Sequence, residues 1–110
     1  MVLFKRSHIR LIKEGRKTQT RRNHRHEWKV GRIYLVKASW YGPIEGYIRI
    51  TRKFRQKLGD ISPEEIRKEG FQSLEEFRQV WEEINGGWNP EEVVTVYEFE
   101  EVKTLWNTQP

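Results

Sequence analysis

The chain has 110 residues and no cysteine, and its 21 Lys and Arg outnumber its 16 Asp and Glu to give a net charge of +5. The lack of cysteine excludes disulfides and thiolate metal sites, and no segment approaches the roughly 18 apolar residues of a membrane-spanning helix. A basic residue follows the start too soon for a signal peptide, so we expect a single domain over residues 1–110 in the cytoplasm.

The charges are distributed unevenly along the chain. Residues 1–57 contain 17 Lys and Arg against three acids, whereas residues 58–110 contain four against 13. Such an asymmetry often marks a basic surface for a polyanion. The alternative is that the two halves pack together and their charges interleave.

A short strand and a short helix are predicted before the first loop. Residues 2–4 are apolar and β-prone. Ser7 is a suitable N-cap for a helix over residues 8–14, and Gly15 stands where a left-handed residue would end that helix. The basic and polar residues that follow, 15–27, predict a loop.

Two strands are predicted next. β-forming residues dominate 32–37 and then about 44–54, with a Gly-Pro break between them. Gly42 and Gly46 can adopt a positive φ angle, so we expect a bend or β-bulge at one of them.

The second half of the chain predicts two helices. Ser62 and Glu65 form a capping-box pattern with proline at the first helical position, and this helix should end near Gly70. Ser73 begins a second capping-box pattern. The helix that follows has apolar residues at helical spacing up to about residue 84, with the tryptophan expected in the core: Phe77, Val80, Trp81 and Ile84.

The last strand, over residues 93–100, has the strongest strand pattern, and residues 103–110 are expected to form a frayed tail. Strands and helices do not alternate regularly, which argues against a doubly wound parallel sheet. We therefore expect an α+β fold in which a small mixed or antiparallel β-barrel carries helices at its edges.

The segment 15–22 has the most distinctive chemistry of the chain. It places one lysine, three arginines and two threonines directly after a glycine. Hydroxyls beside cations suit phosphates, carboxylates or polarised carbonyls. The segment is not a Walker phosphate loop, because the upstream glycine is missing, and the chain has no Gly-x-Ser-x-Gly nucleophile elbow.

Histidines suggest a metal site that we rank last. His24 and His26 are two residues apart, but His8 is distant in sequence and the neighbouring arginines oppose a divalent cation. We expect no metal and no cofactor, and we place a metal-assisted nuclease behind the other functions.

Four segments spread over nearly the whole chain carry a family resemblance. They are Ile9-x-x-Ile12, Gly15-Arg16-Lys17-Thr18-Gln19-Thr20-Arg21, Trp28-x-Val30-Gly31-x-x-Tyr34-x-Val36 and Glu69-Gly70-Phe71-x-Ser73-x-x-x-Phe77. In this order they resemble the ASCH domains, which are small β-barrels of the PUA-like superfamily related to RNA-binding domains.

The resemblance implies two functions. ASCH domains are commonly proposed to bind RNA, and some small bacterial members are amidohydrolases that cleave N4-acetylcytidine. The catalytic lysine, threonine and glutamate of those enzymes match Lys17, Thr20 and Glu69 here. Either Arg21 or Arg22 matches the arginine of the family segment.

The chemistry of such a set can be argued from the residue types. Thr20 attacks an amide carbonyl only when a base takes its proton, and a neutral lysine can be that base. Burial of Lys17 and the like charges of its neighbouring arginines would favour the neutral amine. Direct contact with Glu69 would oppose it, and the better role for Glu69 is to carry a proton to the leaving amine.

Geometry sets a condition on this set. On a regular strand, residues 17 and 20 face opposite sides, so Lys17 and Thr20 reach one pocket only with a turn or bulge. The alternative is an edge strand in which Thr18 and Thr20 face one way and Lys17 is solvated.

We take as first function an RNA-, nucleotide- or nucleoside-binding domain with a basic cleft built on residues 15–22. The alternative is an amidohydrolase that cleaves an N-acylated nucleoside such as N4-acetylcytidine. In both cases the partner is RNA or a modified nucleoside, not a membrane. The expected phosphate ligands are Arg16, Thr18, Arg21 and Arg22, and the expected base-stacking residues are Trp28 and Trp40.

Overall fold

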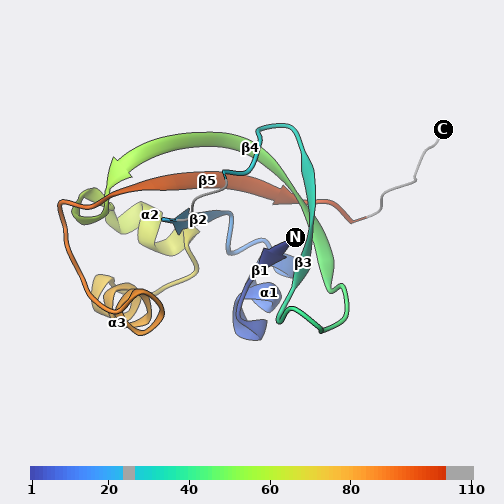
Figure 1. The fold of residues 1–110 in the computed structure, drawn as a ribbon, viewed down its shortest axis with the longest axis horizontal. Coiled ribbons are helices and arrows are strands. Elements are labelled where there is room, and N and C mark those ends of the chain that lie inside the picture. Colours follow the sequence, from blue (N-terminus) through green and yellow to red (C-terminus); the bar gives the residue numbers. More distant parts are fainter. Residues whose placement is uncertain (24–26, 104–110) are drawn as a thin grey trace.

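The structure is a computed structural model, and it describes residues 1–23 and 27–103. These residues form a five-stranded sheet with helices beside it (Figure 1). The elements in chain order are β1 (Val2–Leu3), α1 (Arg6–Lys13), β2 (Gln19–Arg22), β3 (Ile33–Lys37), β4 (Gly46–Lys57), a 3₁₀ turn (Leu58–Asp60), α2 (Pro63–Lys68), α3 (Leu74–Asn85) and β5 (Val93–Glu101).

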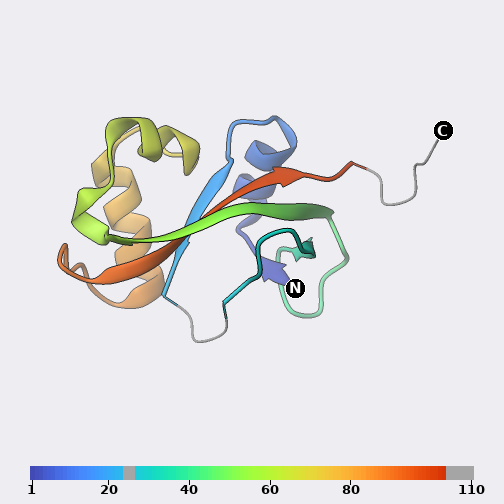
Figure 2. The same cartoon turned by 90° about the horizontal axis from the view of Figure 1, so that it is seen from above.

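The sheet is mixed and has the strand order β1-β3-β4-β5-β2. β1 runs parallel to β3, and the other neighbouring strands are antiparallel. The long strands β4 and β5 curve across the molecule and curl the sheet into a half-barrel, with β1 and β2 as its edges (Figure 2). The expected α+β class, with a small mixed sheet and helices at its edges, is confirmed.

β2 corrects the prediction of a loop over the whole of residues 15–27. Gln19 lies opposite Glu98 of β5 and Arg22 opposite Thr95, so the basic segment becomes an edge strand. Its polarity pointed to a loop, but partners from other elements satisfy its buried side chains, as described below.

Of the predicted bend or bulge, the bend is present at Gly42, between β3 and β4, whereas the bulge lies elsewhere. The register of β4 against β5 shifts between Ile50 and Arg52, not at Gly42 or Gly46. Before the shift, Ile50 lies opposite Phe99. After it, Arg52 lies opposite Glu98, so the even-numbered residues of β4 pair with even-numbered instead of odd-numbered residues of β5.

The helix boundaries marked by Gly15 and by the capping box of α2 are predicted correctly, whereas the start of α1 is not. α1 begins at Arg6 with Lys5 as its N-cap, so the expected cap Ser7 is wrong, whereas Gly15 does take a left-handed φ of 76° just after the helix. The capping box of Ser62 and Glu65 at α2 is confirmed.

In α3 the Ser73 side chain accepts from the Glu76 N–H, as the second capping-box pattern predicts. The Glu76 carboxylate, however, accepts from the Gln72 N–H. Trp81 is buried in the core as expected, but Ile84 is 66% exposed.

Two apolar clusters use opposite faces of β5. Tyr97 and Phe99 pack with α1, β1 and the middle of β4, while Val94 packs with α2 and α3. Burial on both faces explains the nearly continuous apolar pattern of β5. β2, which pairs with β5, therefore lies where the two clusters meet.

No helix in residues 1–23 and 27–103 is long and apolar enough to span a membrane. His24, His26 and all but the first residue of the expected tail lie outside the described residues.

Candidate functional site

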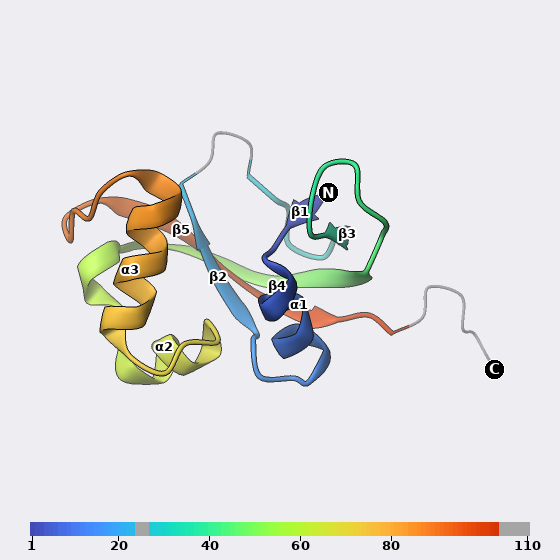
Figure 3. The ribbon, with the colours of Figure 1, turned by 90° about the horizontal axis from the view of Figure 1, so that it is seen from below.

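A cavity of about 510 Å³ is lined by residues of α3, of β1 and the start of α1, and of β2. Figure 3 shows β2 crossing between α3 on one side and β1 with α1 on the other. The apolar wall of the cavity includes the aromatic side chains of Phe4 before α1, Phe71 before α3, and Phe77 and Trp81 within α3. Its polar lining includes every predicted catalytic residue and two of the predicted phosphate ligands: Lys17, Thr20, Glu69, Arg21 and Arg22.

Lys17 is buried at this cavity, with 3% of its surface exposed. Its Nζ donates to the backbone carbonyl of Glu69 at 2.6 Å and to that of Gln19 at 3.2 Å. The nearest oxygen of the Glu69 carboxylate, Oε1, lies 3.6 Å away. The lysine is thus held mainly by two carbonyls.

The chain turn after α2 creates the space for this lysine. Glu69 is the C-cap of α2, and Gly70 follows it with a φ of 95°. A Cβ atom at Gly70 would lie 2.9 Å from Leu11 Cδ1 and 3.6 Å from the Cβ of Lys17. Glycine is therefore required at position 70 both for its conformation and for the close approach of α1.

The environment lowers the pKa of Lys17 to about 8, chiefly because burial removes water from the ammonium group. The positive charges of Arg22 and Arg21 lower the pKa further, while Glu69 raises it. These are the directions expected from the sequence. Arg16, the third arginine expected to contribute, has an exposed side chain that pairs with Glu14.

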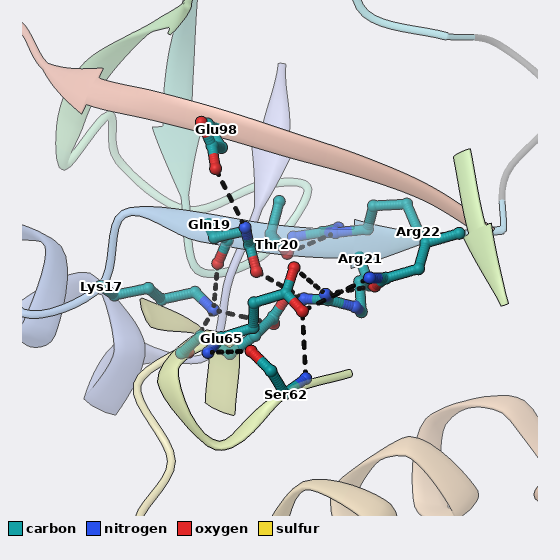
Figure 4. A network of polar contacts seen from close by, with 10 residues as sticks. Lys17, Gln19, Thr20, Arg21, Arg22, Ser62, Glu65 and Glu98 are labelled. Carbon is teal, nitrogen blue, oxygen red and sulfur yellow. Dashed lines mark hydrogen bonds and ion pairs between the residues drawn. The ribbon is translucent and has the colours of Figure 1, made fainter. Parts of the chain in front are cut away.

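Arg21 holds the Glu69 carboxylate from the other side. Its guanidinium is fully buried, and Nη1 donates to Glu69 Oε2 at 2.8 Å and to Gln19 Oε1 at 2.6 Å. Nη2 donates to Gln56 Oε1 at 2.6 Å and to Glu65 Oε2 at 3.0 Å. Figure 4 shows this network, with Glu65 reaching Arg21 from α2.

Four acceptors around one guanidinium explain why such a polar residue is buried in β2. They also leave Arg21 little capacity for a phosphate. Gln56 and Glu65 were not among the predicted site residues. Only the capping box had singled out Glu65, which uses its second oxygen for Arg21.

Thr20 and Arg22 lie on the opposite face of β2 from Gln19 and Arg21, as strand alternation requires. Arg22 Nε donates to Thr20 Oγ1 at 3.2 Å, and Arg22 Nη2 donates to the Leu3 carbonyl at 3.0 Å. Arg22 therefore connects the two edge strands of the half-barrel, β2 and β1.

Lys17 and Thr20 line one cavity without a bulge in β2. Lys17 precedes the first strand residue, Gln19, so the irregular segment after Gly15 supplies the required departure from strand geometry. β2 is also an edge strand, so a cavity beside it is open to residues on both of its faces.

The other expected ligand-binding residues do not line the cavity. Arg16 and Thr18 are exposed outside it. The ring of Trp28 packs 4.6 Å from that of Tyr97, and Trp40 is 69% exposed on the connection between β3 and β4. The predicted basic cleft is thus divided between a buried site and separate surface groups.

The charges of the two halves interleave along much of the sheet. Ion pairs join residues of the basic half to residues of the acidic half both on the surface and at the cavity. The surface pairs include Arg49–Glu100, Arg52–Glu98 and Lys57–Glu91. Part of the excess of 17 Lys and Arg over three acids in residues 1–57 is therefore compensated locally.

Within residues 1–23 and 27–103, no group of three or more histidine, aspartate or glutamate side chains is arranged to hold a metal ion.

Comparison with known proteins gives a fold but no close relative. No family model matches the sequence, and no curated protein does. Among solved structures, an ASCH domain from Lactobacillus crispatus matches with a TM-score of 0.64 at 18% identity, over 84% of this chain and 69% of that one. A mutant of ZmASCH from Zymomonas mobilis matches with a TM-score of 0.67 at 13% identity, over 93% and 73%.

A hypothetical protein, PH0355, matches with a TM-score of 0.70 at 19% identity, over 90% of this chain and 94% of that one. These similarities show that the chain has the fold of ASCH domain structures, as the resemblance of its sequence segments implied.

The network around Arg21 predicts a large difference between a buried and an exposed arginine. Arg21→Ala leaves Glu69 without its closest cation, so we expect the free energy of unfolding to fall by about 3–5 kcal/mol. Arg49→Ala removes only an exposed pair with Glu100 and should change it by less than about 1 kcal/mol. Urea unfolding followed by circular dichroism measures both, and similar small losses would contradict a stabilising role for Arg21.

Proposed function

We propose that the chain is an ASCH-domain amidohydrolase that cleaves a linear amide on an acylated nucleobase, as in N4-acetylcytidine. The observation that carries the proposal is the buried Lys17, whose pKa is lowered to about 8, in one cavity with Thr20 and Glu69. The nucleobase class comes from the resemblance to ASCH domains, and the fold agrees with it.

The hydrogen bonds of Lys17 suit a general base. A neutral amine has two N–H donors and one lone pair. The carbonyls of Gln19 and Glu69 accept two hydrogen bonds from Nζ, so they occupy both donors and leave the lone pair available. The third donor of an ammonium group would have only the Glu69 carboxylate, at 3.6 Å.

The environment of Thr20 suits a nucleophile. Arg22 donates to Oγ1, so the hydroxyl keeps its own proton free to be donated. A cationic donor also stabilises the negative charge that grows on Oγ1 as the proton leaves. The contact between Thr20 and Lys17 would form with substrate bound, since catalytic hydrogen bonds often tighten only then.

The reaction then follows in balanced steps. Oγ1 of Thr20 bonds to the acyl carbon while its proton passes to Nζ of Lys17. The C–N bond breaks, and the amine leaves with a proton that the Glu69 carboxylate has carried from Lys17. Water, deprotonated by Lys17, then hydrolyses the ester on Thr20 to release the carboxylic acid and restore the enzyme.

The size and lining of the cavity also support a nucleoside. Small-molecule sites typically have about 300–1,000 Å³ of space and mainly apolar walls with a few polar groups, and this cavity has about 510 Å³. Phe4, Phe71 and Trp81 supply aromatic surface against which a base can pack.

Replacement of the reacting groups should abolish turnover. Thr20→Val keeps the shape of the side chain but removes the nucleophile, and Lys17→Met removes the base, which alone should lower kcat by about 10²–10⁴-fold. Release of cytidine from N4-acetylcytidine, followed by chromatography, measures the effect.

The exposed residues Thr18 and Lys13 offer matched controls, Thr18→Val and Lys13→Met, which should retain wild-type kcat. Circular dichroism establishes that every variant is folded. Folded Lys17→Met or Thr20→Val enzyme with wild-type turnover would refute the assigned roles.

Nucleic-acid binding is a second candidate, which a separate observation favours. Trp40 and Tyr41 are 69% and 101% exposed, and Lys37 Nζ lies 3.5 Å from the Trp40 carbonyl. Exposed aromatic rings beside a cation can stack on the bases of a single strand while the cation meets its phosphates.

Binding of a mixed-sequence single-stranded RNA tests whether the surface that carries Trp40 and Tyr41 contacts nucleic acid. We expect Trp40→Ala to weaken the affinity by about 5- to 150-fold, because stacking on one aromatic ring contributes about 1–3 kcal/mol. The affinity should also fall steeply as salt rises. Fluorescence anisotropy measures both effects, with Val30→Ala, at an exposed apolar residue, as control. Undetectable or salt-insensitive binding would count against this candidate.

A further inference from the structure

A titratable side chain of the cavity, that of His8, makes no hydrogen bond to the protein in the described parts of the chain. His8 of α1 lines the cavity, and neither of its ring nitrogens is hydrogen-bonded to any residue in the described parts of the chain. Among the described residues, Arg21 Nε and Trp81 Nε1 also lack a partner, but both atoms are buried away from solvent, and the remaining polar groups are bonded. Lys17, Arg21 and Arg22 hold the partners given above, and Asn85 donates to the carbonyl of Trp81.

Packing fixes the His8 ring beside the proposed reacting groups. The ring centroid lies 4.9 Å from that of Phe71, at an angle of 58°. Its Cε1 atom lies 3.8 Å from where a Cβ at Gly70 would be, and the Cβ of Lys17 lies 3.6 Å from the same point. Lys17 Nζ lies 5.9 Å from the centre of the Phe71 ring. His8 and Lys17 are therefore neighbours at one end of the cavity.

The charges that face His8 keep its imidazole neutral. Lys5 precedes α1, Lys17 lies before β2 and Arg22 lies within β2, and Glu69 faces the same space from the end of α2. Burial, followed by the charges of Lys17, Lys5 and Arg22, lowers the pKa of His8 to about 4. A neutral imidazole offers one N–H donor and one acceptor.

We propose that His8 is a further catalytic residue, which donates a hydrogen bond to the acyl oxygen of the bound amide. This rests on the proposed amidohydrolase function. Attack by Thr20 converts the carbonyl oxygen to an oxyanion, and a donor fixed at that atom accelerates the step. Lys17 and Arg22 already donate to protein oxygens, whereas the donor of His8 is free.

A neutral donor also suits this place. Neutral imidazole is known to polarise carbonyl groups in enzymes where a nearby positive end of a helix keeps it from being protonated. Here the cations Lys5, Lys17 and Arg22 have that effect.

The test compares two substitutions at His8. His8→Phe keeps an aromatic ring against Phe71 but removes the donor, and His8→Gln keeps a donor. Ser7→Ala, at an exposed residue of the same helix, is the control. For N4-acetylcytidine hydrolysis, we expect His8→Phe to lower kcat by about 10²-fold. The kcat of His8→Gln should lie between those of His8→Phe and wild type, and the kcat of Ser7→Ala should equal that of wild type.

Inhibition by cytidine separates catalysis from packing. Cytidine lacks the acyl oxygen, so its inhibition constant should stay within about twofold in His8→Phe if His8 acts at that atom. The proposal is overturned if kcat of His8→Phe is within twofold of wild type. It is also overturned if both substitutions lower kcat by the same factor and weaken cytidine binding to a similar extent, because His8 would then only support the packing of the cavity.

Imidazole NMR signals of the wild-type protein keep the two proposals apart. The His8 signals should shift with N4-acetylcytidine and not with cytidine. Hydrolysis by wild type without such a shift refutes the role of His8 alone. A shift without hydrolysis refutes the amidohydrolase and leaves the His8 contact standing, and the absence of both refutes both.

Discussion

The structure depends on how one carboxylate, that of Glu69, is shared between two buried cations. Arg21 is the closer partner, with an N–O distance of 2.8 Å, while Lys17 lies at 3.6 Å. Arg21 also pairs with Glu65 at 3.0 Å, whereas Lys17 has only the longer contact with Glu69, and the energy of an incompletely compensated charge away from water is high. An arginine cannot give up its proton in a protein, but a lysine can. The lysine is therefore the group whose charged form is destabilised.

The same network joins the parts of the fold that form the cavity. Arg21 connects β2 to α2 through Glu65 and Glu69, and to β4 through Gln56. On the other face of β2, Arg22 reaches β1. Side chains on both faces of β2 bond to other elements and so fix this edge strand in place. Because β2 has a neighbouring strand on one side only, its polar groups can line a cavity on the other side. This arrangement lets stabilising and reacting residues alternate within one short segment.

Local signals in the sequence were sufficient for several parts of the fold. The capping box at Ser62 and the left-handed Gly15 were predicted correctly because each depends on neighbouring residues alone. The family resemblance, and not the physical pattern, selected Lys17, Thr20 and Glu69, which do line one cavity. The roles of these three residues stay predictions.

The parts that sequence reasoning missed depend on contacts between distant segments. For β2 a loop was predicted, with a solvated edge strand as the alternative, because its charges argue against burial, and only its partners in α2 and β4 make burial possible. The register shift after Ile50 arises in the pairing of β4 with β5, two strands far apart in the sequence, and no local glycine signals it. His8 was set aside as distant in sequence, yet α1 brings it to Lys17.

The central claim is that the fold holds Lys17 ready to accept a proton near neutral pH. Its most direct test is an NMR titration of the Lys17 side chain in the free protein, with the signal assigned from its loss in Lys17→Met. The account predicts a pKa of about 8 for Lys17, against an ordinary value of 10.5. Titration at or above the ordinary value would contradict it, because Lys17 would then be a permanent cation paired with Glu69.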